Sequence, residues 1–217
     1  MRPMTEDEVL QLYSERAAVW FFNRQGDPKA PHAELTSGRC SDGYVNSAPV
    51  LCDPAVALRL AWQHAVRLFQ RNIYPAWVVG SAYAAITYSY HLATIMGAKH
   101  GFTEKDPKDP KRMIWSRFVI PEGASVMQCE ELITTLQTTN EVKQAVREGN
   151  PNPVKFFSEV VTVVHRPVAL PVDTNRVILP LVERAVKSWA PEECPLCAQG
   201  SPRLKPKHHW AELTGKT

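Results

Sequence analysis

The segment from Ser125 to Val146 constrains this chain more than any other, because it sets two adjacent carboxylates between a buried strand and a helix. An apolar run, 126–129, leads into Glu130 and Glu131, and a hydroxyl-rich turn and an amphipathic stretch follow. This order predicts a parallel strand that ends beside a helix N-terminus. Amides and hydroxyls at a helix start can hold a phosphate, while carboxylates at a strand end can bind ribose hydroxyls or a metal attached to them. The segment therefore predicts a sugar-phosphate site.

Composition limits the class of protein. The 217 residues, 44% of them hydrophobic, are enough for one domain with an appendage and a buried core. A net charge of +3 argues against a dedicated nucleic-acid surface but permits anionic substrates. The acidic N-terminal stretch and the lack of a long apolar run predict neither a signal peptide nor a membrane span. Scattered cysteines at positions 40, 52 and 129 indicate reduced thiols, so we expect a soluble cytoplasmic protein.

Strand and helix patterns alternate along most of the chain. Thr5 and Asp53 are suited to begin helices as N-caps, and Pro54 suits the first helical position. This alternation predicts an α/β fold: a parallel sheet of about five strands flanked by helices, with ligands at the carboxyl ends of the strands. The expected strands cover 76–80, 99–102, 115–120, 125–129 and 159–165, and the expected helices cover 5–22, 53–69, 84–96, 136–148 and, interrupted at Pro180, 176–189.

The segment around the acidic pair resembles the ribose-phosphate signature of the type I phosphoribosyltransferases. The resemblance lies in the acidic pair, the hydrophobic pair that follows it, and Thr134-Thr135. Leu136 and Gln137 stand where that signature has two glycines, and glycine permits close approach of the backbone to phosphate. The resemblance implies a Mg-dependent enzyme that transfers ribose 5-phosphate from phosphoribosyl pyrophosphate to a nitrogenous base. It assigns the ribose hydroxyls, or Mg bound through them, to Glu130 and Glu131, and the 5-phosphate to Thr134, Thr135 and Thr138.

Four more segments are similar to parts of one subfamily, the orotate phosphoribosyltransferases. Residues 35–46 resemble the N-terminal hood that covers the base, and residues 80–86 resemble the pyrophosphate loop. Residues 102–109 resemble the mobile catalytic loop, whose lysines close over pyrophosphate across a dimer interface. Residues 160–167 resemble the strand before the arginine that binds the carboxylate of orotate. The matching residues are Arg39, Tyr44 and Asn46 in the hood, Tyr83, Lys105 and Lys108 for pyrophosphate, and Arg166 for the base.

Elementary chemistry agrees with these assignments. Departure of pyrophosphate from an anomeric carbon needs positive charge on the leaving oxygens, and a closing lid with lysines can supply it. An arginine presents a planar fork that suits a carboxylate. The plainer alternatives are a solvated charged loop, a half-buried tyrosine in a turn and a surface arginine after a strand.

The tail from Pro191 to Pro206 resembles the C-terminal tail of one bacterial and archaeal branch of these enzymes. Cys194 and Cys197 form a C-x-x-C pair, and His208 and His209 follow. Adjacent histidines are awkward for one tetrahedral zinc site, so a thiol pair in a docked tail is the preferred interpretation and zinc the alternative. A disulfide is not expected in the cytosol.

These observations lead to one expectation with two alternatives. Residues 1–52 should form an N-terminal helix and hood, residues 53–189 a phosphoribosyltransferase-like core, and residues 190–217 a tail. The family implies a homodimer that uses orotate and yields a nucleoside monophosphate and pyrophosphate, with no nucleic-acid or membrane partner. The replaced glycines leave open a catalytically impaired relative that binds a nucleotide or a partner, and a transferase for a different base in a specialised pathway.

Overall fold

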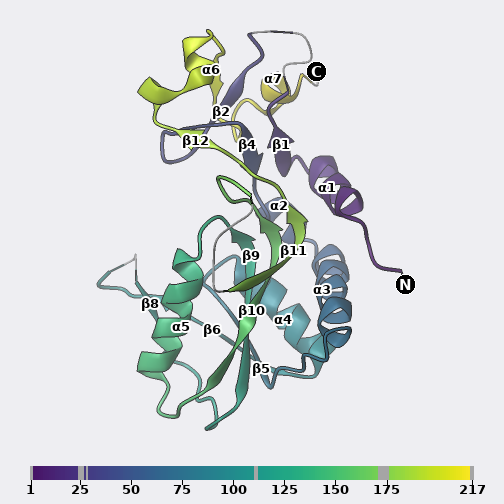
Figure 1. The fold of residues 1–217 in the computed structure, drawn as a ribbon, viewed down its shortest axis with the longest axis vertical. Coiled ribbons are helices and arrows are strands. Elements are labelled where there is room, and N and C mark those ends of the chain that lie inside the picture. Colours follow the sequence, from purple (N-terminus) through teal and green to yellow (C-terminus); the bar gives the residue numbers. More distant parts are fainter. Residues whose placement is uncertain (1, 24–26, 28, 110–111, 171–175, 216–217) are drawn as a thin grey trace.

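A five-stranded sheet with the order β11-β10-β9-β5-β6 forms the centre of the protein, and every neighbouring pair in it is parallel (Figure 1). The structure is a computed structural model, and it describes all residues except 1, 24–26, 28, 110–111, 171–175 and 216–217. The predicted α/β fold with a parallel sheet flanked by helices is thus confirmed. The strands are β5 (Trp77–Gly80), β6 (Lys99–Phe102), β9 (Ser125–Ile133), β10 (Lys155–His165) and β11 (Val177–Glu183).

Helices cover both faces of this sheet. On one face lie α3 (Pro54–Phe69) and α4 (Ala85–Met96), and on the other lies α5 (Gln137–Gly149) (Figure 1). Successive strand residues point to opposite faces, so Val78 belongs to the core under α3 and α4 while Val79 belongs to the core under α5. Burial on both faces explains why these strands are almost continuously apolar. Among the described helices, none is long and apolar enough to cross a membrane.

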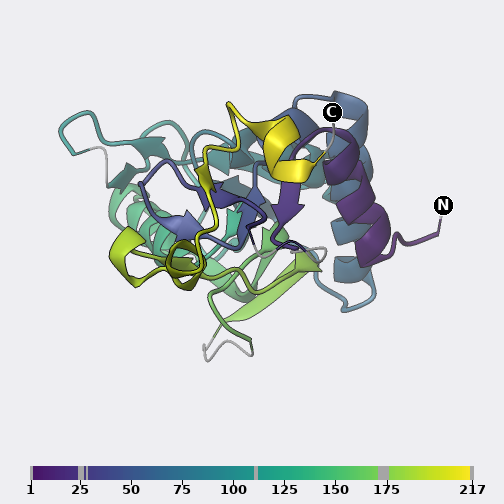
Figure 2. The same cartoon turned by 90° about the horizontal axis from the view of Figure 1, so that it is seen from above.

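A second, smaller sheet lies beyond the carboxyl ends of the central strands. We call it the hood sheet; its order is β12-β3-β2-β13, and Figure 2 views it from above. Two of its strands come from early in the chain and two from late in the chain: β2 (His32–Glu34), β3 (Cys40–Ser41), β12 (Ser188–Trp189) and β13 (Arg203–Leu204). Beside it, β1 (Val19–Phe21) pairs antiparallel with β4 (Gly43–Val45).

Short elements complete the fold. They are α1 (Glu6–Glu15), α2 (Ala48–Leu51), β7 (Glu104–Lys105), β8 (Met113–Ile114), η1 (Pro191–Glu193), α6 (Pro195–Ala198) and α7 (Trp210–Thr214). Both predicted N-caps are confirmed, because Thr5 accepts a hydrogen bond from the amide of Glu8 and Asp53 accepts from the amides of Ala55 and Val56. The first helix ends at Glu15 rather than near Phe22, since Ala17 has a positive φ of 51° and the chain then turns into β1.

Two element predictions are wrong. Residues 115–120 form no strand; Trp115 and Ile120 are instead buried against α5 and the sheet. The predicted helix over 176–189 is replaced by two strands, β11 and β12. Pro180 fits β11 because this strand lies at the edge of the sheet, where a residue without an N–H is tolerated. In addition, β9 continues to Ile133, so the acidic pair lies within the strand near its end rather than after it.

Candidate active site

Glu130 is a buried carboxylate with one unpartnered oxygen. In the strand register Glu130 lies opposite Thr162 of β10, near the carboxyl ends of the central strands. The residue is only 2% exposed. Ser81, directly after β5, donates a hydrogen bond to its Oε2 at 2.5 Å. Its Oε1 has no hydrogen-bond partner among the described residues. Since a buried acceptor without a donor is costly, the site is suited to a ligand that brings a hydroxyl or a cation to this oxygen.

Burial also governs the protonation of the acidic pair. It raises the pKa of Glu130 to about 8, helped by the neighbouring charge of Glu131 and opposed by the hydrogen bond from Ser81 and the charge of Lys105. Burial raises the pKa of Glu131 as well, against hydrogen bonds from its own amide and that of Leu132. Without a ligand, Glu130 is therefore mostly neutral at pH 7, and a partner that favours the ionised form would remove its proton.

The raised pKa of Glu130 predicts that the ligand-free protein loses stability as pH rises from about 4.5 to about 8. In this window the folded protein holds a proton that the unfolded chain has released, so raising the pH favours unfolding. Glu130→Gln removes this contribution. Urea unfolding across the window should therefore show a flatter pH profile for Glu130→Gln than for the parent, and parallel profiles would contradict the assignment.

The predicted phosphate turn is open to solvent. Thr134 and Thr135 are exposed in the turn after β9, and Thr138 is exposed in the first turn of α5. Leu136 occupies the N-cap of α5 and offers no side-chain cap, although Thr135 Oγ1 accepts a weak hydrogen bond from the amide of Gln137 at 3.4 Å. Side-chain hydroxyls and backbone amides with weak hydrogen bonds thus lie together at the start of a helix. Such groups can donate hydrogen bonds to a phosphate.

A pocket of about 340 Å³ lies between the hood and the central sheet. Arg166 reaches it from the end of β10, where its amide donates to the carbonyl of Ile133 at 2.8 Å and extends the sheet. Its Nε is buried and has no hydrogen-bond partner among the described residues, and burial lowers the pKa of its guanidinium. An anionic ligand would offset both costs. The lining residues are Leu35, Thr36, Ser37, Tyr44, Val45, Asn46, Arg166 and Lys207.

Tyr44 and Asn46 enter this pocket from β4 and the residues after it. Burial raises the pKa of the Tyr44 hydroxyl, while a hydrogen bond with the side chain of Asn46 acts the other way. Trp210 of the tail packs edge-on against Tyr44, with ring centroids 6.1 Å apart. The hood thus presents an aromatic ring, held by the tail, on the same pocket as Arg166.

The remaining predicted residues lie around this centre rather than in the pocket. Arg39 is bound to the carbonyl of Ser188 at 3.0 Å and does not line the pocket. Tyr83 is 78% exposed in the turn after β5. Lys105, in β7, lies near enough to Glu130 to lower its pKa, and Lys108 is exposed in the loop that follows.

Three side chains at the site were not predicted. Ser81 orients Glu130, Lys207 lines the pocket, and Trp210 packs on Tyr44. Only Ser81 had a sequence signal, because it directly follows Gly80 at the end of a predicted strand. A larger pocket of about 840 Å³ lies between α1, β1 and α7, and none of the residues assigned above lines it.

Comparison with known proteins decides the family. An orotate phosphoribosyltransferase of Heliobacterium modesticaldum is 31% identical over 206 residues, which cover 94% of this chain and 98% of that protein. The chain belongs to the orotate phosphoribosyltransferase family. A second member of the family, from Pelotomaculum thermopropionicum, is 32% identical over 203 residues, covering 94% of this chain and 97% of the relative. A scan against models of protein families finds no match.

Solved structures agree on the fold. The orotate phosphoribosyltransferase of Aeropyrum pernix superposes with a TM-score of 0.55 at 18% identity, covering 81% of this chain and 93% of that one. An adenine phosphoribosyltransferase from Thermoanaerobacter pseudethanolicus gives 0.52 at 15% identity, covering 65% and 88%. The predicted type I phosphoribosyltransferase fold is therefore confirmed.

Proposed function

We propose that this chain transfers the 5-phosphoribosyl group from phosphoribosyl pyrophosphate to orotate. A bond forms between a ring nitrogen of orotate and the anomeric carbon, that nitrogen releases its proton to solvent or to the departing pyrophosphate, and the bond from the carbon to the pyrophosphate oxygen breaks. A nucleoside monophosphate and pyrophosphate result. The observation that carries the proposal is family membership across 94% of the chain. Five free cysteines suit a reducing compartment, so we place the reaction in the cytoplasm, with neither nucleic acid nor membrane as a partner.

Glu130 and Glu131 are assigned to the ribose. The unpartnered Oε1 of Glu130 supports this role, because a ribose hydroxyl could donate to it. These two carboxylates would also hold Mg²⁺ directly or through the ribose hydroxyls, and a hard cation with oxygen ligands fits them. Bound Mg²⁺ would neutralise charge on the donor's oxygens. The hydrogen bond from Ser81 would hold the Glu130 carboxylate in place during the reaction.

Thr134, Thr135 and Thr138 are assigned to the 5-phosphate. Their exposure at the start of α5 supports the assignment, since solvent-exposed hydroxyls are accessible to an incoming anion. Leu136 and Gln137 replace two glycines of the family signature, so this turn depends more on hydroxyls and less on close backbone approach than that signature does.

Lys105, Lys108 and Tyr83 are assigned to the pyrophosphate. The segment with both lysines follows the carboxyl end of β6, so it begins at the same end of the sheet as the ribose residues, and the charge of Lys105 lowers the pKa of Glu130. Two ammonium groups would stabilise the charge that develops on the leaving oxygens. We expect an oxocarbenium-like transition state by family analogy, in which positioning and electrostatics dominate.

Arg166 is assigned to the carboxylate of orotate, and Tyr44 to the face of its ring. The buried, unpartnered Nε of Arg166 supports the first role. Asn46 and Lys207 line the same pocket and would contact the polar edge of the base. Arg39, held by Ser188, is assigned to steadying the hood instead of touching the base.

A direct assay tests the proposal. The purified protein is mixed with Mg²⁺, phosphoribosyl pyrophosphate and orotate, and formation of the nucleotide and pyrophosphate is measured beside parallel reactions with uracil and adenine. Turnover of orotate above the other bases is expected. Binding of the donor without turnover of any base would favour an impaired relative, and turnover of another base would favour a specialised transferase.

We also propose a homodimer in which Lys105 or Lys108 acts across the interface. A Lys105→Ala/Lys108→Ala chain and a Glu130→Gln chain should each be nearly inactive alone. Mixed dimers would contain one site with both sets of native residues, so refolding the two chains together should restore about a quarter to a half of the activity per site. Sedimentation must show the dimer. A strictly monomeric protein, or inactive heterodimers, would rule out the arrangement.

A further inference from the structure

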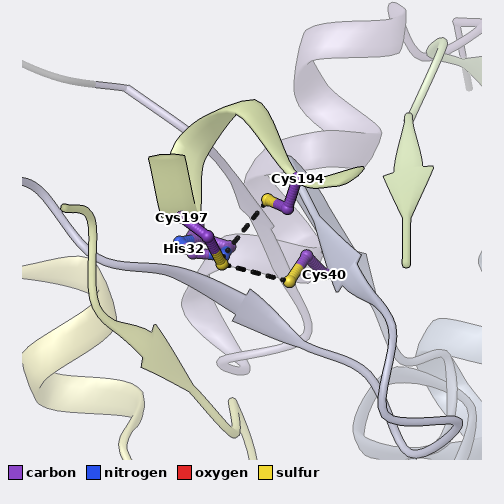
Figure 3. Close-up of side chains that lie close together, drawn as sticks. All are labelled: His32, Cys40, Cys194 and Cys197. Carbon is purple, nitrogen blue, oxygen red and sulfur yellow. Dashed lines mark hydrogen bonds between the residues drawn. The ribbon is translucent and has the colours of Figure 1, made fainter. Parts of the chain in front are cut away.

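Four potential metal ligands from distant parts of the chain meet in the hood. His32 lies in β2 and Cys40 in β3, while Cys194 directly precedes the short helix α6 and Cys197 lies within it (Figure 3). One ligand atom of each lies within 4.8 Å of all the others. His32, Cys40 and Cys194 are buried, and Cys197 is partly exposed. This cluster is separate from the pocket that contains Tyr44 and Arg166.

Three of the six spacings among the four ligand atoms match a tetrahedron around one ion, and the other three are at most 4.8 Å. His32 Nε2 lies 3.6 Å from Cys194 Sγ and 3.5 Å from Cys197 Sγ, and Cys40 Sγ lies 3.6 Å from Cys197 Sγ. A tetrahedral zinc with bonds of about 2.3 Å to sulfur and about 2.0 Å to nitrogen requires roughly 3.5 Å between nitrogen and sulfur and roughly 3.8 Å between sulfurs. The observed distances agree with both requirements to within about 0.2 Å.

The second ring nitrogen of His32 fixes the tautomer that a metal needs. Its Nδ1 lies 2.8 Å from Ser201 Oγ, and that hydroxyl donates its own hydrogen to the carbonyl of Ala30 at 2.6 Å. Ser201 can therefore only accept from His32, which places the ring proton on Nδ1. The lone pair of Nε2 is left facing the thiols, as in the metal sites whose histidine is held by an outer hydrogen bond.

Neither a disulfide nor ordinary apolar packing accounts for the cluster as well as a metal does. The Cys40 and Cys197 sulfurs are 3.6 Å apart, whereas a disulfide bond is about 2.0 Å long, and a disulfide would leave the third thiol and the histidine without a role. The apolar core around these thiols is small: its buried residues are Cys40, Cys194 and Leu196. His209, one of the tail histidines considered from the sequence, is paired with Glu212 outside the cluster.

We propose that His32, Cys40, Cys194 and Cys197 bind one structural zinc ion that fastens the tail to the hood. All four positions of the tetrahedron are taken by protein, which is typical of a structural site rather than a catalytic one. Three thiolates and one imidazole favour zinc over hard cations such as Mg²⁺ or Ca²⁺. The ion joins β2, β3 and α6 where hydrophobic packing alone is sparse.

Metal analysis of the unmodified protein tests the proposal without relying on activity. Protein purified without chelators should contain about one zinc per chain by elemental analysis. After the zinc is removed, cobalt(II) should bind with the same stoichiometry and give the intense visible bands of tetrahedral cobalt bound by thiolates. Removal should also lower the unfolding temperature by on the order of 10 °C.

Matched serine variants locate the site. Cys194→Ser should lose most of the zinc, whereas Cys52→Ser, which changes an exposed cysteine outside the cluster, should keep it. If Cys194→Ser does not fold, the metal content and cobalt spectrum of the parent still decide the matter. A parent protein with negligible zinc and no cobalt uptake would overturn the proposal. So would a disulfide between cluster cysteines found by thiol counting, or iron with a visible colour in place of zinc.

Discussion

Glu130→Gln is expected to lower kcat/KM for nucleotide formation by about a hundredfold or more, and Glu131→Gln should have an effect of similar size. A hydrogen bond to a charged group is worth about 1.5 to 3 kcal/mol, and loss of one or two such bonds to the ribose hydroxyls gives a factor of this order. Binding of phosphoribosyl pyrophosphate with Mg²⁺, measured by titration calorimetry, should weaken in parallel, because the proposed contacts are to the donor itself.

The same substitution should leave the fold intact. In the ligand-free protein Glu130 is mostly neutral at pH 7, so an amide of equal size replaces a protonated acid, and its oxygen can still accept from Ser81. Glu122→Gln serves as the matched control, since Glu122 is exposed just before β9. Unchanged affinity and rate in both acidic-pair variants, beside an unchanged control, would remove the ribose assignment.

Arg166→Ala should lower kcat/KM for orotate by about ten- to a hundredfold. Its guanidinium is partly buried with the Nε fully so, and a fork on a partly buried carboxylate contributes about 1.5 to 3 kcal/mol. Affinity for uracil, which has no carboxylate, should hardly change. Tyr44→Ala, in contrast, should weaken both pyrimidines alike, because the ring face is common to them.

One further variant separates the effect of the two parallel hydrogen bonds of the arginine from the effect of its charge. Arg166→Lys keeps a cation but cannot form two parallel hydrogen bonds, so its affinity for orotate should fall between those of the parent and Arg166→Ala. Arg59→Ala is the matched control, because Arg59 is exposed on α3, away from the pocket. Equal binding of orotate and uracil by the parent would mean that another base is the substrate.

Neighbouring residues in the sequence were sufficient to predict some helices and strands but not others. The start of α3 followed from Asp53 and Pro54, since a side-chain cap and a fixed φ act over a few residues. The segment 176–189 was mistaken for a helix because its apolar residues fit either period. Pairing with β10, some 20 positions earlier, decides its extended form, and such pairing is a tertiary effect that local sequence does not contain.

In the candidate site, too, some residues could be predicted from their neighbours in the sequence and others could not. The location of the acidic pair near a strand end, and of the threonines at a helix start, could be predicted because both lie next to one strand and one helix. Lys207 and Trp210 could not, since they reach the hood only through the path of the tail. His32 and Cys40 gave no signal as partners of the C-x-x-C pair, because the order of strands in the hood sheet alone brings them together.

The hood sheet has a consequence for how this protein folds. Its strands β2 and β13 are paired although some 170 positions separate them, as the contact between His32 and Ser201 illustrates, whereas the central sheet is built from one continuous stretch between them. Contacts so far apart in the chain are expected to form late. On the ribosome, the nascent central sheet can assemble while His32, Cys40 and Tyr44 still await their partners. The pocket lined by Tyr44, Arg166 and Lys207 is therefore expected to be completed last.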